Sequence, residues 1–343
     1  MAKNDLLSIE NLYLSYRIYK GTLKVLNNVN FEVRQGEKVG LVGETGCGKT
    51  TTMKAILRIL PEQAIITGEK ILFKGVDLIN ANGEELQYIR RKEIAMIFQD
   101  PTSSLNPVFT IGDQLCDVIK FALIGNNRSL KKPNINLKDI AVQALHNASM
   151  PDPVRILNNY PFQLSGGMRQ RVCIAMALAT ERNLLIADEP TTNLDVTIQD
   201  QVLRLIKRLV ERKNISLILI THSLGIAREY TDRVYVMYAG SIVEMAETKE
   251  LFENALHPYT LGLLGSVPKL TGEGISQGIP GSLPDYLNPP RGCRFAPRCS
   301  QAMKVCQYEV PPFQEIVPRH YVLCFLYVRR QSNERNPCCQ ETH

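Results

Sequence analysis

The sequence contains no run of about 18 apolar residues, so it offers no candidate for a membrane-spanning helix. Its first residues, Met-Ala-Lys-Asn-Asp-Leu-Leu, lack the apolar core of a secretory signal peptide. Between residues 108 and 160 no apolar heptad is sustained, which argues against a coiled coil there. These absences predict a cytoplasmic protein that has no membrane-spanning segment of its own.

The composition is that of an ordinary globular protein, with 44% hydrophobic and 22% charged residues. A chain of 343 residues exceeds what one hydrophobic core usually holds, which predicts two domains. The net charge of +6 is modest. Such a charge permits binding to anionic lipid or nucleic acid, but mild basicity is also typical of a solvated surface, so it selects neither.

One glycine-rich stretch, Gly43 to Thr50, reads G-x-x-x-x-G-K-T, the P-loop pattern. Apolar residues within 37–42 predict a buried strand before it, and residues 51–60 show helical spacing after it. Backbone N–H groups of such a loop cradle phosphate oxygens, Lys49 reaches the β- and γ-phosphates, and the Thr50 hydroxyl binds Mg²⁺. The alternative is a glycine turn that binds nothing. The predicted nucleotide-binding residues here are Gly43, Glu44, Thr45, Gly46, Cys47, Gly48, Lys49, Thr50 and Thr51.

Polar side chains follow three more predicted strands. Gln99 comes directly after one apolar run, Asp188 and Glu189 end a second, and His222 ends a third. Because ligands of α/β sheets bind at the carboxyl ends of the strands, these groups are candidates for one site. We expect Asp188 near Mg²⁺, Glu189 to polarise an attacking water, and His222 to contact the γ-phosphate. The alternatives are a Gln that merely ends a strand, structural acids and a structural histidine.

Residues 164–171 read Leu-Ser-Gly-Gly-Met-Arg-Gln-Arg and lead into a predicted helix. Ser165 is a natural N-cap, and Gly166 and Gly167 free backbone N–H groups at the start of that helix. A helix N-terminus attracts anions, so this stretch is a second candidate phosphate site. Alone the motif is weak, but a P-loop about 120 residues earlier strengthens it.

The cysteines are unevenly placed: six of the nine lie in the last 51 residues. In a chain expected to be cytoplasmic, clustered cysteines indicate a metal site more than disulfides. Cys293, Cys299, Cys306 and Cys324 are separated by five, six and seventeen residues, which is neither the zinc-ribbon nor the ferredoxin spacing. Four reduced thiols, a structural zinc ion and a four-iron, four-sulfur cluster all remain open at this point.

Together these motifs resemble the ATPase domain of ABC transporters over roughly residues 6–265. The residues that carry the resemblance, in the family's order and spacing, are Gly43–Thr50, Gln99, Leu164–Gln170, Ile186–Pro190, Leu194, Asp195 and His222. Other stretches resemble the oligopeptide/dipeptide/nickel importer subfamily, and most of all its D-type ATPase subunit. They are Phe98–Pro107, His257–Thr260, Ile279–Gly281, Gly292–Cys299, Cys306 and His320–Cys324.

The resemblance implies an α/β fold: a P-loop NTPase of the ABC ATPase type, with a mixed sheet core, an antiparallel β subdomain and an α-helical subdomain. It places the ATPase domain at residues 1–265, with the helical subdomain at about residues 100–178. The subfamily's C-terminal extension, a small loop-rich module, is expected at residues 266–343. Because the cysteine spacing resembles members that carry a four-iron, four-sulfur (4Fe-4S) cluster, that cluster is expected here, with zinc as the alternative. Its expected ligands are Cys293, Cys299, Cys306 and Cys324.

Family roles carry over to the residues that match its motifs. Tyr16 takes the position that stacks on the adenine of ATP. Gln99 shares the Mg²⁺ site with Thr50 and Asp188 and links it to the membrane subunits. The catalytic set implied by the resemblance is Glu189, His222, Lys49 and Gln99.

A second group of residues acts across a dimer of ATPase subunits in the family. Ser165, Gly166 and Gly167 would bind the γ-phosphate held by the P-loop of the opposing subunit. Asp195 belongs to the loop that crosses between the subunits. One chain alone is therefore expected to hydrolyse ATP poorly.

The resemblance implies the ATP-hydrolysing subunit of a membrane importer, peripheral to the cytoplasmic face of the membrane. Its expected partners are a second ATPase subunit of different sequence, two membrane permease subunits and, indirectly, an external substrate-binding protein. Asn193 and Ser223 depart from the residues usual at these positions, and neither change removes a catalytic group.

Peptide is the expected cargo, with nickel, glutathione or an oligosaccharide as alternatives. A soluble ABC ATPase that acts on nucleic acid usually has two ATPase domains in one chain or a long coiled coil. The stretch between Gln99 and Ser165 has neither, so no nucleic-acid partner is expected. A module that binds ATP without hydrolysing it typically loses the carboxylate that Glu189 provides.

Overall fold

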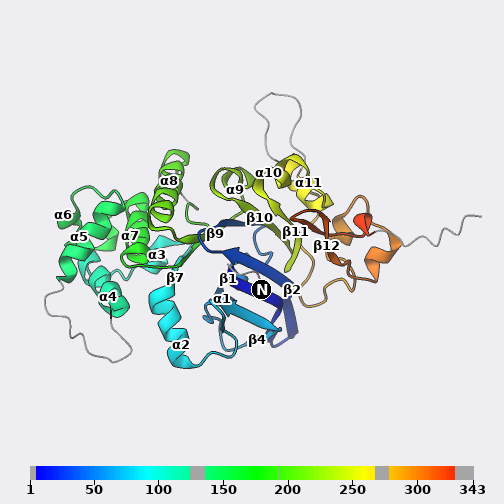
Figure 1. Cartoon of the computed structure of the whole chain (residues 1–343), viewed down its shortest axis with the longest axis horizontal. Helices are drawn as coiled ribbons and strands as arrows, with labels where there is room; N and C mark the ends of the chain where they lie inside the picture. The colour runs from blue at the N-terminus through cyan, green and yellow to red at the C-terminus, as the bar shows by residue number, and fades with distance from the viewer. Residues whose placement is uncertain (1–4, 124–135, 193, 267–277, 329–343) are drawn as a thin grey trace, which may run out of the picture.

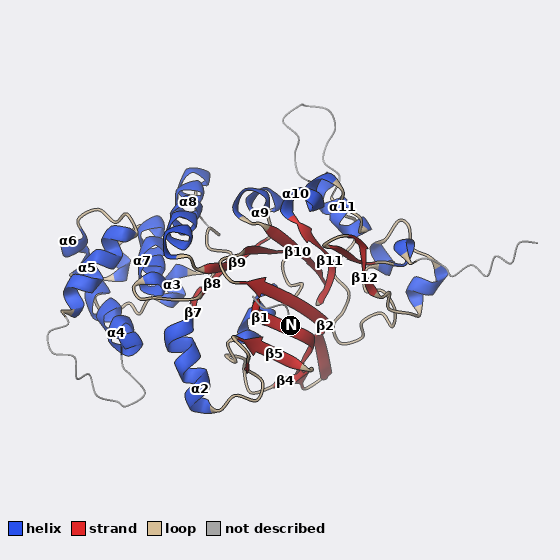
Figure 2. Cartoon of the chain, in the orientation of Figure 1, coloured by secondary structure: helices blue, strands red, loops and turns tan. Residues whose placement is uncertain are grey.

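The computed structural model describes residues 5–123, 136–192, 194–266 and 278–328. Most of its strands belong to a large mixed sheet (Figures 1 and 2). In sheet order these strands are β12 (Phe313–Val317), β13 (His320–Leu323), β11 (Ser241–Glu247), β10 (Arg233–Tyr238), β3 (Lys38–Val42), β9 (Ser216–Thr221), β8 (Leu184–Asp188) and β7 (Ile94–Ile97).

A smaller antiparallel sheet lies beside this one (Figure 2). Its strands are β1 (Asp5–Ile18), β2 (Gly21–Arg34), β4 (Ala64–Thr67), β5 (Lys70–Phe73) and β6 (Val76–Asp77). The long β1–β2 hairpin carries the sheet, and β1 also pairs with β4 and β5. The antiparallel β subdomain that the resemblance implied is this sheet.

The α-helices of the described residues fall into two groups by their place in the molecule. One group gathers at one end of the molecule, at the left in Figure 1: α3 (Pro101–Ser104), α4 (Ile111–Leu123), α5 (Leu137–Asn147), α6 (Pro153–Leu157) and α7 (Gly166–Leu178). The others are α1 (Lys49–Ile56), α2 (Gly83–Tyr88), α8 (Val196–Lys213), α9 (Leu224–Tyr230), α10 (Thr248–Glu253) and α11 (Pro258–Gly265). No helix of the described residues is both long and apolar enough to cross a membrane.

The centre of the large sheet is parallel and buried on both faces. From β10 through β3, β9 and β8 to β7, all neighbours run parallel. Side chains alternate between faces along a strand, so Leu184 and Ile186 belong to the core shared with α1 and the small sheet. Leu185 and Ala187 belong to the other core, shared with the helical end. Strands covered on both faces read as continuous apolar runs, which is why these strands were visible in the sequence.

The C-terminal residues contribute to the large sheet. Strand β13 pairs antiparallel with β11, with Val322 opposite Glu244 and Tyr321 opposite Met245. The resemblance implied a loop-rich module here, and the two strands were not foreseen from the sequence. Segments of four and five residues without an unbroken apolar run give little signal alone, and the edge of an existing sheet supplies their hydrogen-bond partners. A separate domain at residues 266–343 stays a prediction.

Candidate functional site

The P-loop lies where the buried strand β3 meets α1. A Cβ on Gly43 would lie 2.2 Å from the backbone oxygen of Met237, so no larger residue fits there. Gly48 has a φ of 112°, and a Cβ on it would lie 2.9 Å from Leu26. Both positions need glycine, one for a close backbone approach and one for a left-handed conformation. The shape of the loop is therefore set by its neighbours in the fold as well as by its own residues.

Lys49 begins α1, and its ammonium group points back into the loop. Its Nζ donates hydrogen bonds to the carbonyl oxygens of Gly43 (2.7 Å) and Glu44 (3.0 Å). It also lies 4.0 Å from Oε1 of Glu189. Only 4% of this side chain is exposed. A buried cation held by loop carbonyls at a helix N-terminus is well placed to neutralise a bound phosphate.

Thr50 and Asp188 meet although they are far apart in sequence. The Thr50 hydroxyl donates to Oδ1 of Asp188 at 3.1 Å. Burial raises the pKa of Asp188, and the hydrogen bond from Thr50 opposes that rise. A hydroxyl and a carboxylate are hard oxygen donors of the kind that bind Mg²⁺, so these residues fit the ion expected with ATP.

Glu189 is the meeting point of the predicted strand-end residues. Its Oε2 accepts hydrogen bonds from Nε2 of Gln99 (3.1 Å) and from the hydroxyl of Thr192 (3.1 Å). Nδ1 of His222 lies 3.4 Å from the same oxygen. The structure therefore brings Gln99, Glu189, His222 and Lys49 together, as the sequence analysis expected. Thr192 was not predicted, and only its place three residues after Glu189 could have pointed to it.

The backbone of Glu189 is in an unusual conformation. Its φ is 44°, which is costly for a residue with a Cβ. Its N–H donates to the carbonyl oxygen of Ile220 at 3.0 Å, which anchors the residue to β9. Strain of this kind persists where the surrounding structure holds it, and it gathers at functional sites. Here it turns the carboxylate toward the P-loop lysine.

The Ser165 segment occupies a different part of the molecule. Ser165 caps α7 and accepts a hydrogen bond from the N–H of Met168 at 3.3 Å. A Cβ on Gly167 would meet Ile198 of α8 at 2.9 Å, and Gly166 faces Leu194. In Figure 1, α7 and α1 lie well apart. Within one chain this segment is thus built onto α8, away from the P-loop.

Two further predicted residues lie at exposed or half-buried positions. Asp195 is exposed at the start of α8. Tyr16 is half-buried on β1, opposite Leu23 of β2 and Ala64 of β4. Asn193, one of the two unusual residues noted in the sequence, lies outside the described residues.

The four C-terminal cysteines are present as free thiols. Burial raises the pKa of Cys293, Cys299 and Cys324, the last to about 11, and neighbouring thiols add to each rise. The backbone N–H of Cys293 donates to the carbonyl oxygen of Cys306 at 2.9 Å, so these two residues are neighbours in the fold. Yet no three His, Cys, Asp or Glu side chains among the described residues form a group that could hold a metal ion. The described residues therefore show no site for a single metal ion, and the predicted metal centre stays a prediction.

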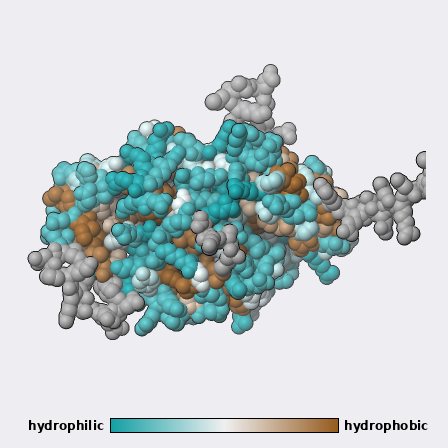
Figure 3. All heavy atoms as spheres, in the orientation of Figure 1, coloured by the Kyte–Doolittle hydropathy of each residue, from teal (hydrophilic) through white to brown (hydrophobic). Residues whose placement is uncertain are grey.

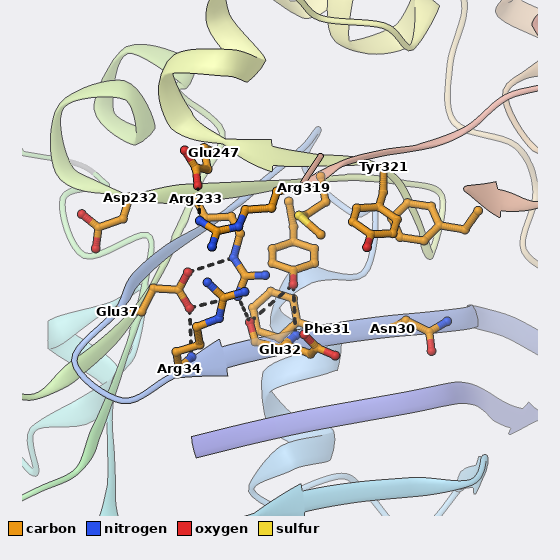
Figure 4. Close-up of a pocket in the computed structure, with 13 residues that line it drawn as sticks. Asn30, Phe31, Glu32, Arg34, Glu37, Asp232, Arg233, Glu247, Arg319 and Tyr321 are labelled. Atoms are coloured by element: carbon orange, nitrogen blue, oxygen red, sulfur yellow. Dashed lines mark hydrogen bonds and ion pairs between the residues drawn. The ribbon is translucent and has the colours of Figure 1, made fainter. Parts of the chain in front are cut away.

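A cavity of about 520 Å³ opens elsewhere, between β2 and the strands β10, β11, β12 and β13 (Figure 4). Its charged groups largely satisfy one another: Arg233 makes two 2.9 Å contacts with Glu37, and Arg319 lies 2.8 Å from Glu247. None of the residues that line it belongs to the P-loop or to the group around Glu189. This cavity is therefore not the nucleotide site.

Two family models match the chain. Residues 26–192 match the family described as "ABC transporter", and residues 243–306 match "Oligopeptide/dipeptide transporter, C-terminal region". The dipeptide transport ATP-binding protein DppD of Bacillus subtilis (strain 168) is 44% identical over 94% of this chain and 95% of its own length. The chain belongs to the ABC transporter ATPase family.

Other relatives of this ABC ATPase agree with that assignment. The oligopeptide transport ATP-binding protein OppD of Bacillus subtilis (strain 168) is 44% identical over 94% of this chain and 88% of its own length. The ATP-binding cassette MJ0796, solved as a dimer bound to ADP and Pi, matches with a TM-score of 0.61 and 27% identity. That match covers 71% of this chain and 98% of the cassette. Like its family, the chain is an ATP hydrolase.

Proposed function

We propose that this ABC ATPase drives the import of di- or oligopeptides by hydrolysing ATP at the cytoplasmic face of a membrane. The proposal of ATP hydrolysis rests on the position of Glu189, whose carboxylate is held by three polar partners beside the P-loop lysine. The cargo part rests on the names of its relatives, which are peptide transport proteins in Bacillus subtilis. Nickel, glutathione and oligosaccharide remain alternative cargoes for the same ATPase.

Each residue of the site has a proposed role in phosphoryl transfer to water. The N–H groups of the P-loop and Lys49 bind and neutralise the phosphates. The carboxylate of Glu189 orients the attacking water, and Gln99 and Thr192 fix that carboxylate through their hydrogen bonds. His222, 3.4 Å from Glu189, contacts the γ-phosphate. Tyr16 stacks on adenine.

Thr50, Asp188 and Gln99 are the proposed Mg²⁺ ligands. The 3.1 Å hydrogen bond from Thr50 to Asp188 keeps both oxygens at the same place beside the P-loop. When bound, Mg²⁺ neutralises charge on the phosphate oxygens. Because Gln99 also contacts Glu189, a shift of the Gln99 loop would alter the ion site and the base together.

Two ATPase subunits are needed to complete each site under this proposal. Ser165, Gly166 and Gly167 are built onto α8, apart from the P-loop of their own chain. They would bind the γ-phosphate held by a second subunit, with the exposed Asp195 near the crossing point. A chain of different sequence is the proposed second subunit.

The proposed contact with the membrane permease subunits is a groove beside Gln99. This groove has a volume of about 340 Å³ and an apolar lining that includes Ile97, Phe98 and Met176. Phe98 is 41% exposed, and it directly precedes Gln99. Further exposed apolar side chains, Phe109 and Phe121, belong to the helical end, where Figure 3 shows brown patches. A permease segment seated there would sense movement of Gln99.

Cys293, Cys299, Cys306 and Cys324 remain proposed ligands of a 4Fe-4S cluster, with zinc as the alternative. The spacing of these cysteines, together with the 2.9 Å backbone contact between Cys293 and Cys306, supports the proposal. The lack of a group able to hold a single ion among the described residues counts against zinc more than against a cluster. In a cluster each thiolate binds a different iron, so the sulfur atoms stand farther apart than around one ion.

The test is the ATPase activity of the assembled importer in lipid, with its substrate-binding protein supplied either empty or loaded. Dipeptide-loaded binding protein should stimulate hydrolysis, whereas binding protein offered nickel, glutathione or an oligosaccharide should not. Stimulation by one of the other cargoes alone would reject the peptide assignment. Absence of hydrolysis under every condition would reject the enzymatic one.

A further inference from the structure

The C-terminal extension touches the P-loop through an ion pair whose arginine side chain is buried and whose glutamate side chain is 28% exposed. The guanidinium group of Arg298 donates two hydrogen bonds to the carboxylate of Glu44, the second residue of the P-loop, at 3.0 and 3.1 Å. The Arg298 side chain is only 6% exposed. The same group donates to the carbonyl oxygens of Ile279 (3.1 Å) and Pro280 (2.8 Å). Arg298 is therefore fixed by its own segment and presents a rigid fork to Glu44.

A second contact from the extension lies two residues further along the loop. The hydroxyl of Tyr286 donates to the carbonyl oxygen of Gly46 at 2.8 Å. The backbone oxygen of Tyr286 accepts from the N–H of Lys24 in β2 at 2.8 Å. The extension thus spans from the β1–β2 hairpin, which carries Tyr16, to the P-loop. Gly46 has a φ of 84° and no side chain, so this carbonyl contact restrains a residue with wide backbone freedom.

The P-loop is also held by a cluster of aromatic rings. The N–H of Glu44 donates to the hydroxyl of Tyr259 at 3.0 Å, and Tyr259 is fully buried. The ring of Tyr259 lies 4.7 Å from that of Tyr238 and 5.4 Å from that of Phe295, both edge-on. Phe295 belongs to the same short segment as Arg298. The N–H and the carboxylate of Glu44 are therefore both hydrogen-bonded to groups that pack against one another.

These contacts matter because a glycine-rich loop must be ordered before its N–H groups can converge on phosphate. Ordering that occurs only on binding weakens affinity by its entropic cost, whereas a preordered loop avoids that cost. We propose that Arg298 and Tyr286 are positioning residues that hold the P-loop in its nucleotide-binding shape. The C-terminal extension then contributes to nucleotide binding by ordering the P-loop. This inference rests on the proposed function of the P-loop.

The same extension offers a matched control. Arg319 forms an ion pair with Glu247 at 2.8 Å, but its side chain is 64% exposed and its partner 56% exposed. Exposed pairs contribute little, whereas a bidentate pair with one buried partner, as between Arg298 and the 28% exposed Glu44, holds both groups more firmly. Arg319→Gln therefore tests the loss of an arginine from the extension without touching the P-loop.

The experiment measures KM for ATP and kcat of the assembled importer, and MgADP affinity of the full chain, for Arg298→Gln, Arg298→Lys, Tyr286→Phe and Arg319→Gln. We expect Arg298→Gln to raise KM and the MgADP dissociation constant about tenfold with kcat within about twofold, since it breaks a charge-assisted, bidentate contact. Arg298→Lys keeps the charge without the fork and should restore part of the loss. Tyr286→Phe should raise KM about threefold, because it removes one neutral hydrogen bond. Arg319→Gln should match the wild type.

Thermal unfolding without nucleotide reports whether each variant folds. If Arg298→Gln does not fold, the KM of Tyr286→Phe tests the inference by itself, because removing one hydroxyl group preserves the fold. Unchanged KM in every folded variant, or equal losses in Arg319→Gln, would overturn the inference. So would a fall in kcat at constant KM. A wild-type importer without any ATPase activity would instead contradict the proposed function.

Discussion

Gln99 and Glu189 come from the ends of adjacent strands and are joined by a 3.1 Å hydrogen bond from Nε2 to Oε2. Strands β7 and β8 run parallel, with Ile97 opposite Ala187, so both polar residues leave the sheet at the same edge. The groove beside Phe98 begins one residue before Gln99. A single short path of contacts thus connects the proposed permease-binding groove with the proposed catalytic carboxylate.

Glu189→Gln should abolish most turnover while leaving ATP binding intact. The amide keeps the size of the side chain but cannot polarise water, so the expected loss in kcat is about 10²-fold or more. The ATP-bound variant should accumulate as a closed dimer, detectable by light scattering. Glu247→Gln, at an exposed position remote from the P-loop, is the control. Wild-type turnover in the assembled importer with Glu189→Gln would contradict the assigned role.

Lys49→Ala should weaken nucleotide binding itself. Its ammonium group is the only cation that lies within 4.0 Å of Glu189 among the Lys and Arg ion pairs of the described residues, and it also bonds two loop carbonyls. Without it, bound phosphate charge is left without a partner in a buried site. Calorimetric titration with ATP measures the loss. An unchanged dissociation constant would show that the lysine does not reach the phosphates.

Asp188→Asn should stabilise the nucleotide-free chain at neutral pH while it weakens Mg²⁺-dependent hydrolysis. Burial raises the pKa of Asp188, so the folded state disfavours the charged carboxylate and its burial destabilises the fold above that pKa. Asn carries no charge and can still accept the hydrogen bond from Thr50. The gain in melting temperature should therefore be present near pH 7 and disappear as the pH falls through the pKa of Asp188. A gain independent of pH would contradict the explanation.

Purification of the importer with its membrane subunits should reveal a second ATPase chain of similar size. Under the proposed function, the exposed Asp195 and the separately located Ser165 segment act on a second subunit, and the subfamily resemblance predicts that its sequence differs. Mass spectrometry of the intact complex gives the answer directly. A fully active complex with two copies of this chain would contradict the expected heteromer.

Protein purified without oxygen should absorb broadly near ~400 nm and hold about four irons per chain if the four cysteines bind a 4Fe-4S cluster. Cys299→Ser should then lose iron, whereas Cys116→Ser, a change in α4, should not. One zinc ion and no iron per chain would reject the cluster and support the alternative, a zinc site. Folded chain with no metal at all would reject both.

The sequence was enough to predict most of the residues that the structure brings together in the candidate nucleotide site, because its motifs are short and local. The P-loop needs glycines at set positions, and Gln99, Asp188, Glu189 and His222 each follow an apolar run that reads as a buried strand. Parallel neighbouring strands end at one edge of a sheet, so the sequence alone predicts that these residues meet. Thr192 was missed because nothing in its local pattern distinguishes it from an ordinary turn residue.

Local pattern determined the strands, the loop and the family of this protein, since each depends on neighbours within about ten residues. Only the tertiary structure determined which residues from the C-terminal part of the chain contact the P-loop. Arg298 is 254 residues from Glu44, and Tyr286 is 240 from Gly46. It also decided that β13 joins β11 and that the backbones of Cys293 and Cys306 meet. Contacts at such separations depend on how complete elements pack, and no periodicity in the chain encodes them.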